Sequence, residues 1–306
     1  MNQRQSHFRL SLKALLVLVM AVALLLGFVV WTTPRDEDAA RAKALREAGL
    51  DVDLEIRNVY GLPWSKEGRI VRATHTLRPF PRTRRNGLSV PNPLVFDELQ
   101  HCQFLEEIAL SDSEIQSDDV LPLLRLPYLR HIALIDTAVD DRFLQALDGN
   151  PILTLDLRHT FVTGVGLSHL RGSPHLRSLW VRGPGVTGDC FQDLATCPKL
   201  AYLWIGGTNL TGEDLHHLAA APSLKELHLV DGQVQPEDLA FLSQTSIRFL
   251  TVPCKPSQLP VDTLMQSSII SVSVIWHQPL DAEDDAVIAE LQRQVGVDIV
   301  GPRDTF

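Results

Sequence analysis

The densest group of possible ligand atoms in the sequence is an acidic run near its C-terminal end, Asp281-Ala-Glu283-Asp284-Asp285. Closely spaced carboxylates can coordinate calcium, but a calcium loop of the EF-hand type needs glycine at its sixth position and glutamate at its twelfth. Counted from Asp281, those positions hold Ala286 and Gln292. Acidic residues also favour the first turn of a helix, where backbone N–H groups carry partial positive charge. The run therefore predicts a helix N-terminus and no metal site.

The other reactive side chains lack the spacing that catalysis requires. The chain contains no HExxH, G-x-S-x-G, P-loop or G-x-G-x-x-G motif. His216 and His217 are adjacent, and adjacent helical residues do not share a face, so they do not form a ligand pair. The cysteines form no CxxC pair and are predicted to be free thiols: Cys102, Cys190, Cys197 and Cys254. We expect no enzymatic activity, no metal and no cofactor.

A second group of chemically distinctive residues recurs at a fixed interval. Trp180 and Trp204 are 24 residues apart, and so are Arg158 and Arg182. Aromatic and arginine side chains dominate the hot spots of protein interfaces. Recurrence at one interval indicates that a repeating unit displays them, so their arrangement depends on the elements of that unit.

The pattern L-x-x-L-x-L, with Ile or Val substituting for Leu, returns seven times between Leu105 and Val252. Successive starts are separated by 24, 23, 24, 24, 24 and 23 residues. In the first six blocks the predicted strand is followed by an apolar residue and then by a pair of apolar residues three apart, and five of these blocks also have a proline. Four blocks also carry a residue that can cap a helix through its side-chain oxygen: Asp140, Thr163, Thr187 and Thr211. Each block reads as strand, loop and short helix, and stacked blocks bury a continuous core.

This residue pattern resembles the leucine-rich-repeat family, specifically the short bacterial variety reading LxxLxLxxTxVTxxxLxxLxxxPx. Cys197-Pro198 at a block junction is similar to the cysteine-containing subclass. The resemblance covers about residues 94 to 252 and implies an α/β solenoid with parallel strands on its concave face and short helices on its convex face. The sequence departs from the common pattern by placing Thr or Ser where an asparagine ladder would lie. By analogy alone, the family implies a binding module.

Strand side chains between the buried leucines point onto the concave face, because successive strand residues face opposite sides of a sheet. The middle repeats thereby bring aromatic residues onto neighbouring strands, with arginines beside them. The predicted binding site comprises Asp156, Arg158, Trp180, Arg182, Tyr202, Trp204 and His228. Exposed aromatic patches are unusual on soluble surfaces unless something binds there, so we expect a protein or peptide ligand, with a glycan less favoured. The alternative is cross-strand aromatic packing that only stiffens the sheet.

The N-terminal region contains an uncharged run of 18 residues, from Ala14 to Trp31. At about 1.5 Å per residue a helix of this length reaches roughly 27 Å, close to the hydrocarbon thickness of a bilayer. Basic residues precede the run and acidic ones follow it, which predicts a cytoplasmic N-terminus and extracytoplasmic repeats. A cleaved signal peptide is the alternative, but the run is longer than an ordinary signal-peptide core and no A-x-A site follows. We therefore expect a single-pass membrane protein with an uncleaved signal anchor.

The predicted organisation has five parts. Residues 1–13 form a cytoplasmic basic segment, 14–31 the anchor, and 94–252 the repeats. Between anchor and repeats, residues 32–93 hold a juxtamembrane helix at 36–47, strands at 52–56 and 70–77 that cap the solenoid, and a Pro/Arg-rich loop at 78–93. Residues 253–306 hold a degenerate repeat and a C-terminal cap, with a strand at 269–274 and an amphipathic helix at 281–294. The pattern predicts no regular element for 253–268.

Charge and composition narrow the possible functions. The formal net charge is −9, which repels phosphate backbones, so nucleic acid is excluded as a partner. With 45% hydrophobic and 21% charged residues, the chain has the composition of a folded protein. The sequence predicts a membrane-tethered, non-enzymatic interaction protein that binds its ligand on the concave face. The alternative is a structural envelope component that self-associates through its repeats.

Overall fold

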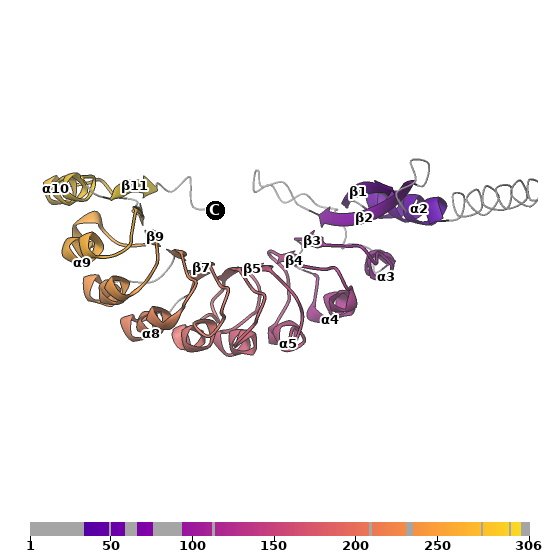
Figure 1. Ribbon diagram of the computed structural model, residues 1–306, viewed down its shortest axis with the longest axis horizontal. Coiled ribbons are helices and arrows are strands. Elements are labelled where there is room, and N and C mark those ends of the chain that lie inside the picture. Colours follow the sequence, from indigo (N-terminus) through magenta and orange to yellow (C-terminus); the bar gives the residue numbers. More distant parts are fainter. Residues whose placement is uncertain are drawn as a thin grey trace, which may run out of the picture.

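The structure, a computed structural model, describes residues 34–48, 50–58, 66–75, 94–111, 114–207, 210–230, 235–276, 278–293 and 295–300. Strands and helices alternate along this part of the chain and stack into an arc (Figure 1). The strands line the inner, concave side of the arc, and the helices form its outer, convex side. The α/β solenoid predicted from the repeats is therefore confirmed.

One sheet of eleven strands runs the length of the arc, and its strands lie in sequence order. β1 and β2 are antiparallel, and every later neighbour is parallel. The strands are β1 (Asp51–Asn58), β2 (Lys66–His75), β3 (Glu107–Leu110), β4 (His131–Leu134), β5 (Thr154–Arg158), β6 (Ser178–Arg182), β7 (Tyr202–Gly206), β8 (Glu226–Leu229), β9 (Phe249–Val252), β10 (Ser271–Ile275) and β11 (Gly296–Val300).

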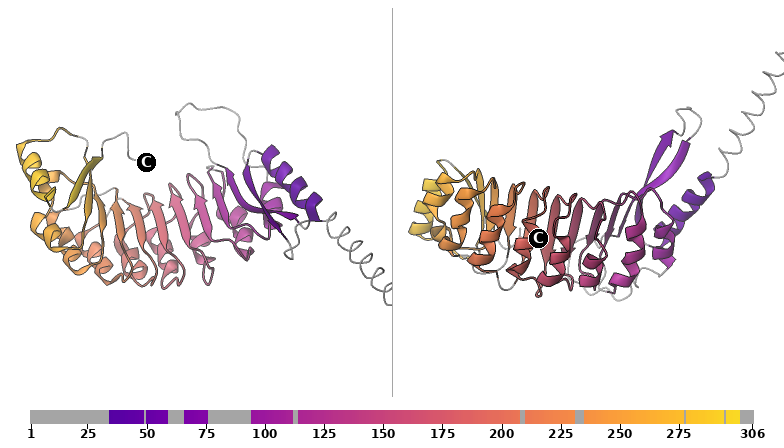
Figure 2. Two further views of the ribbon diagram at one scale, coloured as in Figure 1. Left: turned by 45° about the horizontal axis from the view of Figure 1, so that its top comes forward. Right: turned by 60° about the horizontal axis from the view of Figure 1, so that its bottom comes forward.

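The helices stack side by side along the convex face (Figure 2), and most are short because a repeat of about 24 residues leaves room for only one or two turns. The α-helices are α2 (Pro34–Glu47), α3 (Leu94–Gln100), α4 (Ser117–Val120), α5 (Asp141–Gln145), α6 (Gly164–Leu167), α7 (Phe191–Leu194), α8 (Gly212–His216), α9 (Val261–Gln266) and α10 (Ala282–Leu291). The 3-10 helices are η2 (Leu121–Arg125), η3 (Ser168–Leu170), η4 (Gly188–Cys190), η5 (His217–Ala220), η6 (Pro236–Gln244) and η7 (Pro256–Gln258).

A single hydrophobic core fills the space between sheet and helices. In every repeat the three apolar strand positions are buried, as Leu155, Leu179 and Leu203 illustrate at 0% exposure. The paired helix residues, such as Phe191 and Leu194, close the core from the convex side. Because each repeat buries its apolar face against its neighbours, the strands are held in register along the whole arc.

Side-chain caps begin three of the four helices for which the sequence predicts them. The side chains of Asp140, Thr163 and Thr211 accept hydrogen bonds from backbone N–H groups in the first turns of α5, α6 and α8. Thr187 occupies the same position before η4 but makes no such bond. Its hydroxyl instead lies 3.3 Å from Oδ2 of Asp189. The cap predicted at Thr187 is therefore wrong, although its helix does begin there.

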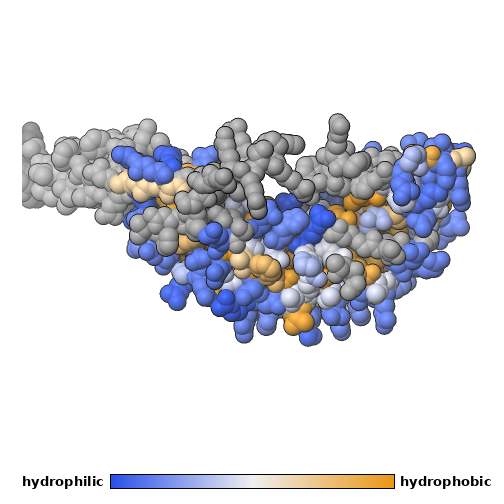
Figure 3. Space-filling model, turned by 180° about the vertical axis from the view of Figure 1, so that it is seen from behind, coloured by the Kyte–Doolittle hydropathy of each residue, from blue (hydrophilic) through white to orange (hydrophobic). Residues whose placement is uncertain are grey.

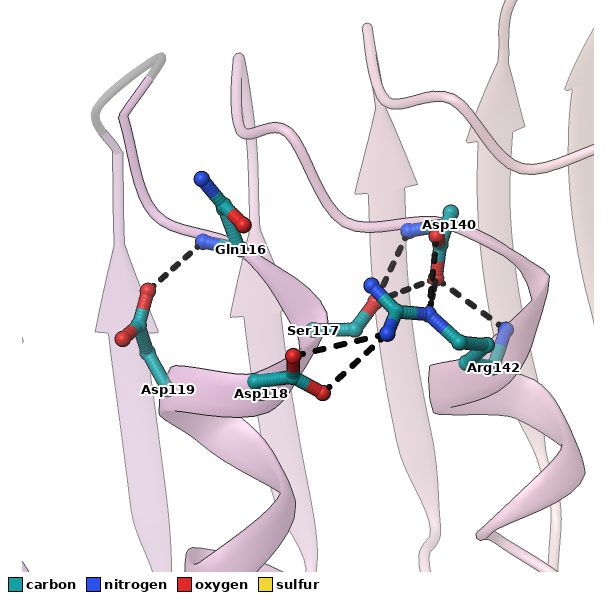
Figure 4. Close-up of polar contacts among 6 residues, drawn as sticks. All are labelled: Gln116, Ser117, Asp118, Asp119, Asp140 and Arg142. Carbon is teal, nitrogen blue, oxygen red and sulfur yellow. Dashed lines mark hydrogen bonds and ion pairs between the residues drawn. The ribbon is translucent and has the colours of Figure 1, made fainter.

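Polar side chains link the starts of successive helices (Figure 4). Ser117, in α4, donates its hydroxyl to Oδ1 of Asp140 at 2.6 Å, and Arg142 reaches back from α5 to Asp118 at 3.3 Å. At the next junction Thr163 donates its N–H and its hydroxyl to the Asp141 carboxylate, at 2.8 and 2.7 Å. These side chains join repeats on the helical side of the molecule, where the sheet ladder does not reach.

Where the common family pattern has an asparagine ladder, Thr137 and Thr160 make hydrogen bonds that stay within their own repeats. The Thr137 hydroxyl donates to the Leu134 carbonyl at 3.2 Å, and the Thr160 hydroxyl to the Leu157 carbonyl at 2.8 Å. Both side chains are buried, and both bonds stay within one repeat. The threonine hydroxyls thus satisfy a backbone carbonyl near the end of each strand.

Glycines allow neighbouring helix starts to approach closely. A Cβ on Gly164 would collide with Thr187, one on Gly188 with the Asp214 side chain, and one on Gly212 with the Asp238 side chain. Gly164, Gly188 and Gly212 each follow a threonine, at the same place in three consecutive repeats. The first turn of each of these helices is therefore packed directly on the next repeat.

The ends of the solenoid agree with the sequence in part. At the N-terminal end, α2, β1 and β2 confirm the predicted helix and strands, with β2 beginning four residues earlier than expected. At the C-terminal end, β10 and α10 confirm the predicted strand and helix. The segment 253–268, for which no element was predicted, contains η7 and α9, and the last helix is followed by β11. The expectation that a helix closes the solenoid is therefore wrong, because β11 extends the parallel sheet by one more strand.

The acidic run begins a helix, as predicted. Asp281 accepts hydrogen bonds from the N–H groups of Glu283 and Asp284, both at 3.0 Å, and receives Lys255 Nζ at 2.6 Å. Among the described residues no group of three or more His, Cys, Asp or Glu side chains is arranged to hold a metal ion. All four cysteines are buried free thiols, which confirms that prediction.

The predicted anchor, 14–31, and the Pro/Arg-rich loop, 78–93, lie outside the described residues. Within the part of the chain that the structure covers, no helix combines the length and the apolar character needed to cross a membrane.

Candidate functional site

The predicted site residues meet on the concave sheet surface. Strand register places Asp156, Trp180, Trp204 and His228 in one row across four consecutive strands, β5 to β8. Tyr202 lies in the parallel row beside it, between Ser178 and Glu226. Arg158 and Arg182 are register partners at the ends of β5 and β6. The spacing of the repeat was sufficient to predict these neighbours, because in-register parallel strands turn a sequence interval into a spatial row.

Arg158 is held in one orientation by the carboxylate of Asp156. Its Nε donates to Oδ1 at 3.0 Å and its Nη2 to Oδ2 at 2.8 Å, which is a bidentate pair. Asp156 is 8% exposed, so the pair is largely shielded from solvent. The guanidinium carbon lies 5.4 Å from the centroid of the Trp204 ring, within the range of a cation–π interaction. The positive charge of Arg158 is thereby held in a fixed orientation against the aromatic face of Trp204.

The remaining rings form a continuous contact across three strands. The centroids of Trp180 and Tyr202 are 4.6 Å apart, and those of Tyr202 and His228 are 4.9 Å apart. All three side chains are half-buried, so their packing covers part of the surface that the sequence predicted to be exposed. Burial also raises the pKa of the Tyr202 hydroxyl, so this group stays protonated at neutral pH. The aromatic rings therefore pack across the strands, as the alternative interpretation expected. Each ring still exposes part of its surface on the concave face.

His228 ends the aromatic row with one satisfied and one unsatisfied nitrogen. Its Nδ1 lies 2.7 Å from the Thr251 hydroxyl. Its Nε2 is buried and has no hydrogen-bond partner, because Oε2 of Glu226 is 3.8 Å away, beyond hydrogen-bond length. Burial lowers the pKa of the imidazole, and the nearby Glu226 carboxylate opposes that shift. The ring is therefore predominantly neutral at neutral pH.

The site combines side chains that are suited to non-covalent binding. The Asp156–Arg158 pair is committed to its two hydrogen bonds. His228 lies 2.7 Å from the Thr251 hydroxyl and 3.8 Å from the Glu226 carboxylate. Half-buried rings and an oriented guanidinium are the groups that recognise apolar and polar features of a peptide. The predicted set did not include Phe249, which is 39% exposed and in register with Glu226 on the next strand. Phe249 stands at the same repeat position as Tyr202, and this equivalence could have identified it from the sequence.

No protein-family model matches the chain, and no curated protein matches it. Among solved structures, the chain is similar to a plant peptide hormone receptor, RGFR1, in complex with RGF2, at 11% sequence identity and a TM-score of 0.31. The match covers 66% of this chain and 38% of the receptor chain, so this chain spans well under half of that receptor. A likeness at this level does not bear on the ligand or on the site.

Proposed function

We propose that this protein is a non-enzymatic binding protein that takes a protein or peptide ligand on the concave face of its solenoid. The observation that carries the proposal is the cluster from Arg158 to His228, in which an ion pair fixes a guanidinium over the Trp204 ring, beside the three half-exposed rings of Trp180, Tyr202 and His228. Rigid aromatic and arginine groups lose little conformational entropy on binding, which favours affinity. The proposal includes a membrane tether at residues 14–31, with the repeats on the extracytoplasmic side.

Site-specific crosslinking in the full chain tests the concave site. A photo-crosslinking residue replaces Ser178, which is half-buried beside Tyr202 on the concave face. The matched control carries the same residue at Gln192, which is exposed on the convex helix α7. We expect a crosslinked partner from position 178 only, and its loss in a Trp180→Ala/Trp204→Ala variant that circular dichroism shows to be folded.

Other outcomes of this experiment contradict the proposal. Equal crosslinking from both positions, or crosslinking that survives the double variant, would exclude the concave surface as the site. Crosslinks that join copies of this chain through the convex position would favour the alternative of a self-associating envelope component.

The tether is tested with an introduced thiol. Because all four native cysteines are buried, a Gln192→Cys variant offers one accessible thiol. A membrane-impermeant maleimide added to intact spheroplasts should label this variant and not the wild type. Labelling that requires lysis would place the repeats on the cytoplasmic side and overturn this part of the proposal.

A further inference from the structure

Two of the most exposed large apolar side chains lie four residues apart in one repeat. Phe161, in the loop after β5, is 69% exposed, and Val165, in α6, is 70% exposed. On the side of the arc seen in Figure 3, hydrophobic residues occupy only separate spots on a mainly hydrophilic surface. The other exposed large apolar side chains of the described residues lie at least ten residues from one another in the sequence, so the close pair is particular to the third repeat.

The repeat pattern does not require an apolar residue at either position. The residues equivalent to Val165 in the other repeats are charged and exposed: Asp118, Arg142, Asp189, Glu213 and Glu237. The position of Phe161 holds Glu114, Ala138 and Gly185 in neighbouring repeats. Because exposing apolar surface to water is unfavourable, and because other repeats fill these positions with charged or small residues, the pair points to a contact outside the chain.

The backbone that carries the pair is held firmly. Thr163, between the two residues, is fixed by Asp141 through its N–H and its hydroxyl. Its hydroxyl oxygen accepts the N–H of Gly166 at 3.2 Å. A Cβ on Gly164 or Gly166 would collide with Thr187 or Asp141, so the first turn of α6 cannot shift toward its neighbours. A surface ordered in advance loses little entropy on binding.

The charges around the pair determine which partner fits. Beyond Val165, the equivalent positions of the next three repeats are acidic: Asp189, Glu213 and Glu237. Glu213 and Glu237 are exposed, and neither forms an ion pair with another described residue. On the other side, Arg142 is compensated by Asp118 and Asp140. These exposed carboxylates favour a cationic segment over an anionic one.

We propose that Phe161 and Val165, with Asp189, Glu213 and Glu237 beside them, form a docking surface for a basic protein segment that carries an apolar anchor. This docking surface is separate from the concave site. The anchor covers the apolar pair, and lysine or arginine side chains of the partner lie along the acidic row.

Fluorescence anisotropy with labelled peptides tests the docking surface in the full, detergent-solubilised chain. The probe is a twelve-residue peptide with a Phe-Leu anchor followed by spaced lysines. Two control peptides replace the anchor by serines or the lysines by glutamates. We expect the Phe161→Ser/Val165→Asp variant to weaken binding of the probe by about tenfold, since loss of an interface anchor has effects of this size. Val165→Asp restores the acidic residue of the repeat at a helix N-terminus, so this variant is expected to fold.

Further variants separate the parts of the proposal. Glu213→Gln/Glu237→Gln should weaken binding by a few-fold and reduce its dependence on salt, as expected for exposed charges. Ile270→Ser, which removes an apolar residue of 48% exposure elsewhere, should leave affinity unchanged.

The docking surface is rejected if the Phe161→Ser/Val165→Asp variant binds as tightly as the wild type. It is equally rejected if either control peptide binds as well as the probe, or if the probe does not bind at a concentration of about 1 mM. Loss of probe binding in Trp180→Ala/Trp204→Ala would move the contact to the concave face and also overturn the proposal. Failure of the concave site in the crosslinking experiment leaves these outcomes unchanged, so the two proposals are tested independently.

Discussion

The guanidinium of Arg158, on β5, lies over the ring of Trp204, on β7, although strand β6 runs between them. Asp156 makes this reach possible, because its carboxylate fixes the guanidinium by two hydrogen bonds on the same strand. This contact thereby connects β5 to β7 across β6 through side chains alone. The same contact would orient the arginine toward a ligand.

Replacing Asp156 by Asn should destabilise the fold and loosen this arrangement. The change removes the negative partner of a pair whose side chains are 12% and 22% exposed. Loss of one partner from a fully buried pair costs about 3–5 kcal/mol, and partial exposure reduces this to roughly 1–3 kcal/mol. Urea denaturation measures the difference. The control Arg158→Lys keeps the charge but not the bidentate geometry, so it should lose less, and an Asp156→Asn protein as stable as wild type would show that the pair contributes nothing.

His228 should make the protein less stable in mild acid. Burial lowers the pKa of its imidazole below the ordinary value of 6.5, so in this pH range the unfolded chain binds a proton more readily than the folded one. Stability is then complete above about pH 6.5 and falls as pH decreases toward the folded-state pKa. Urea titrations between pH 7.5 and 5 on wild type and His228→Gln isolate this contribution. The pH dependence of wild type should exceed that of the variant, and identical curves would contradict the assignment.

Gly188→Ala should be destabilising even though alanine is the better helix former. Its Cβ would collide with the side chain of Asp214 in the next repeat. Overpacking of this kind costs about 1–3 kcal/mol. A double-mutant cycle with Asp214→Gly separates collision from propensity, because the penalty of Gly188→Ala should shrink once the whole Asp214 side chain, whose Cβ is among the colliding atoms, is removed. An unchanged penalty in that background would show that the two residues do not interfere.

Equivalent threonines in neighbouring repeats should respond differently to alanine. Thr163 caps α6 by accepting a backbone N–H, whereas Thr187 makes no cap bond. Thr163→Ala should cost about 1–2 kcal/mol, the usual value of a helix cap, and Thr187→Ala should cost less. Thermal denaturation of the two variants provides the comparison. Equal losses would mean that the caps are not what distinguishes these repeats.

The cysteines should be unreactive in the folded protein. Burial raises the pKa values of the Cys190 and Cys254 thiols to about 12, and the thiolate is the reactive form. Ellman's reagent at pH 8 should therefore detect no thiol in the native chain and four after denaturation. Fast reaction of any thiol without denaturant would show that the core opens locally at that residue.

Most of the fold could be predicted from the sequence because the same residue pattern recurs in seven blocks, so each position is supported by its equivalents in the other blocks. The burial of Leu155 and Leu179, and the row from Asp156 to His228, follow from one interval and the alternation of strand side chains. What it missed depends on contacts between repeats, which spacing does not specify. The missing cap bond of Thr187 and the close approach of Gly188 to the Asp214 side chain depend on where the next repeat lies. The strand β11 was missed because it lies beyond the regular repeats, directly after the helix predicted at 281–294.

The helix-start links and the glycine contacts together fix how far the arc can bend. Tighter curvature would pull neighbouring helices apart, and the bonds from Ser117 to Asp140 and from Thr163 to Asp141 oppose that movement. Straightening would press the helices together, and Gly188 and Gly212 have no space left toward the next repeat. Since both movements meet resistance, the radius of the concave surface is a built-in dimension of the molecule. A partner that binds the concave face, as proposed above, would therefore have to fit a surface whose curvature is fixed in advance.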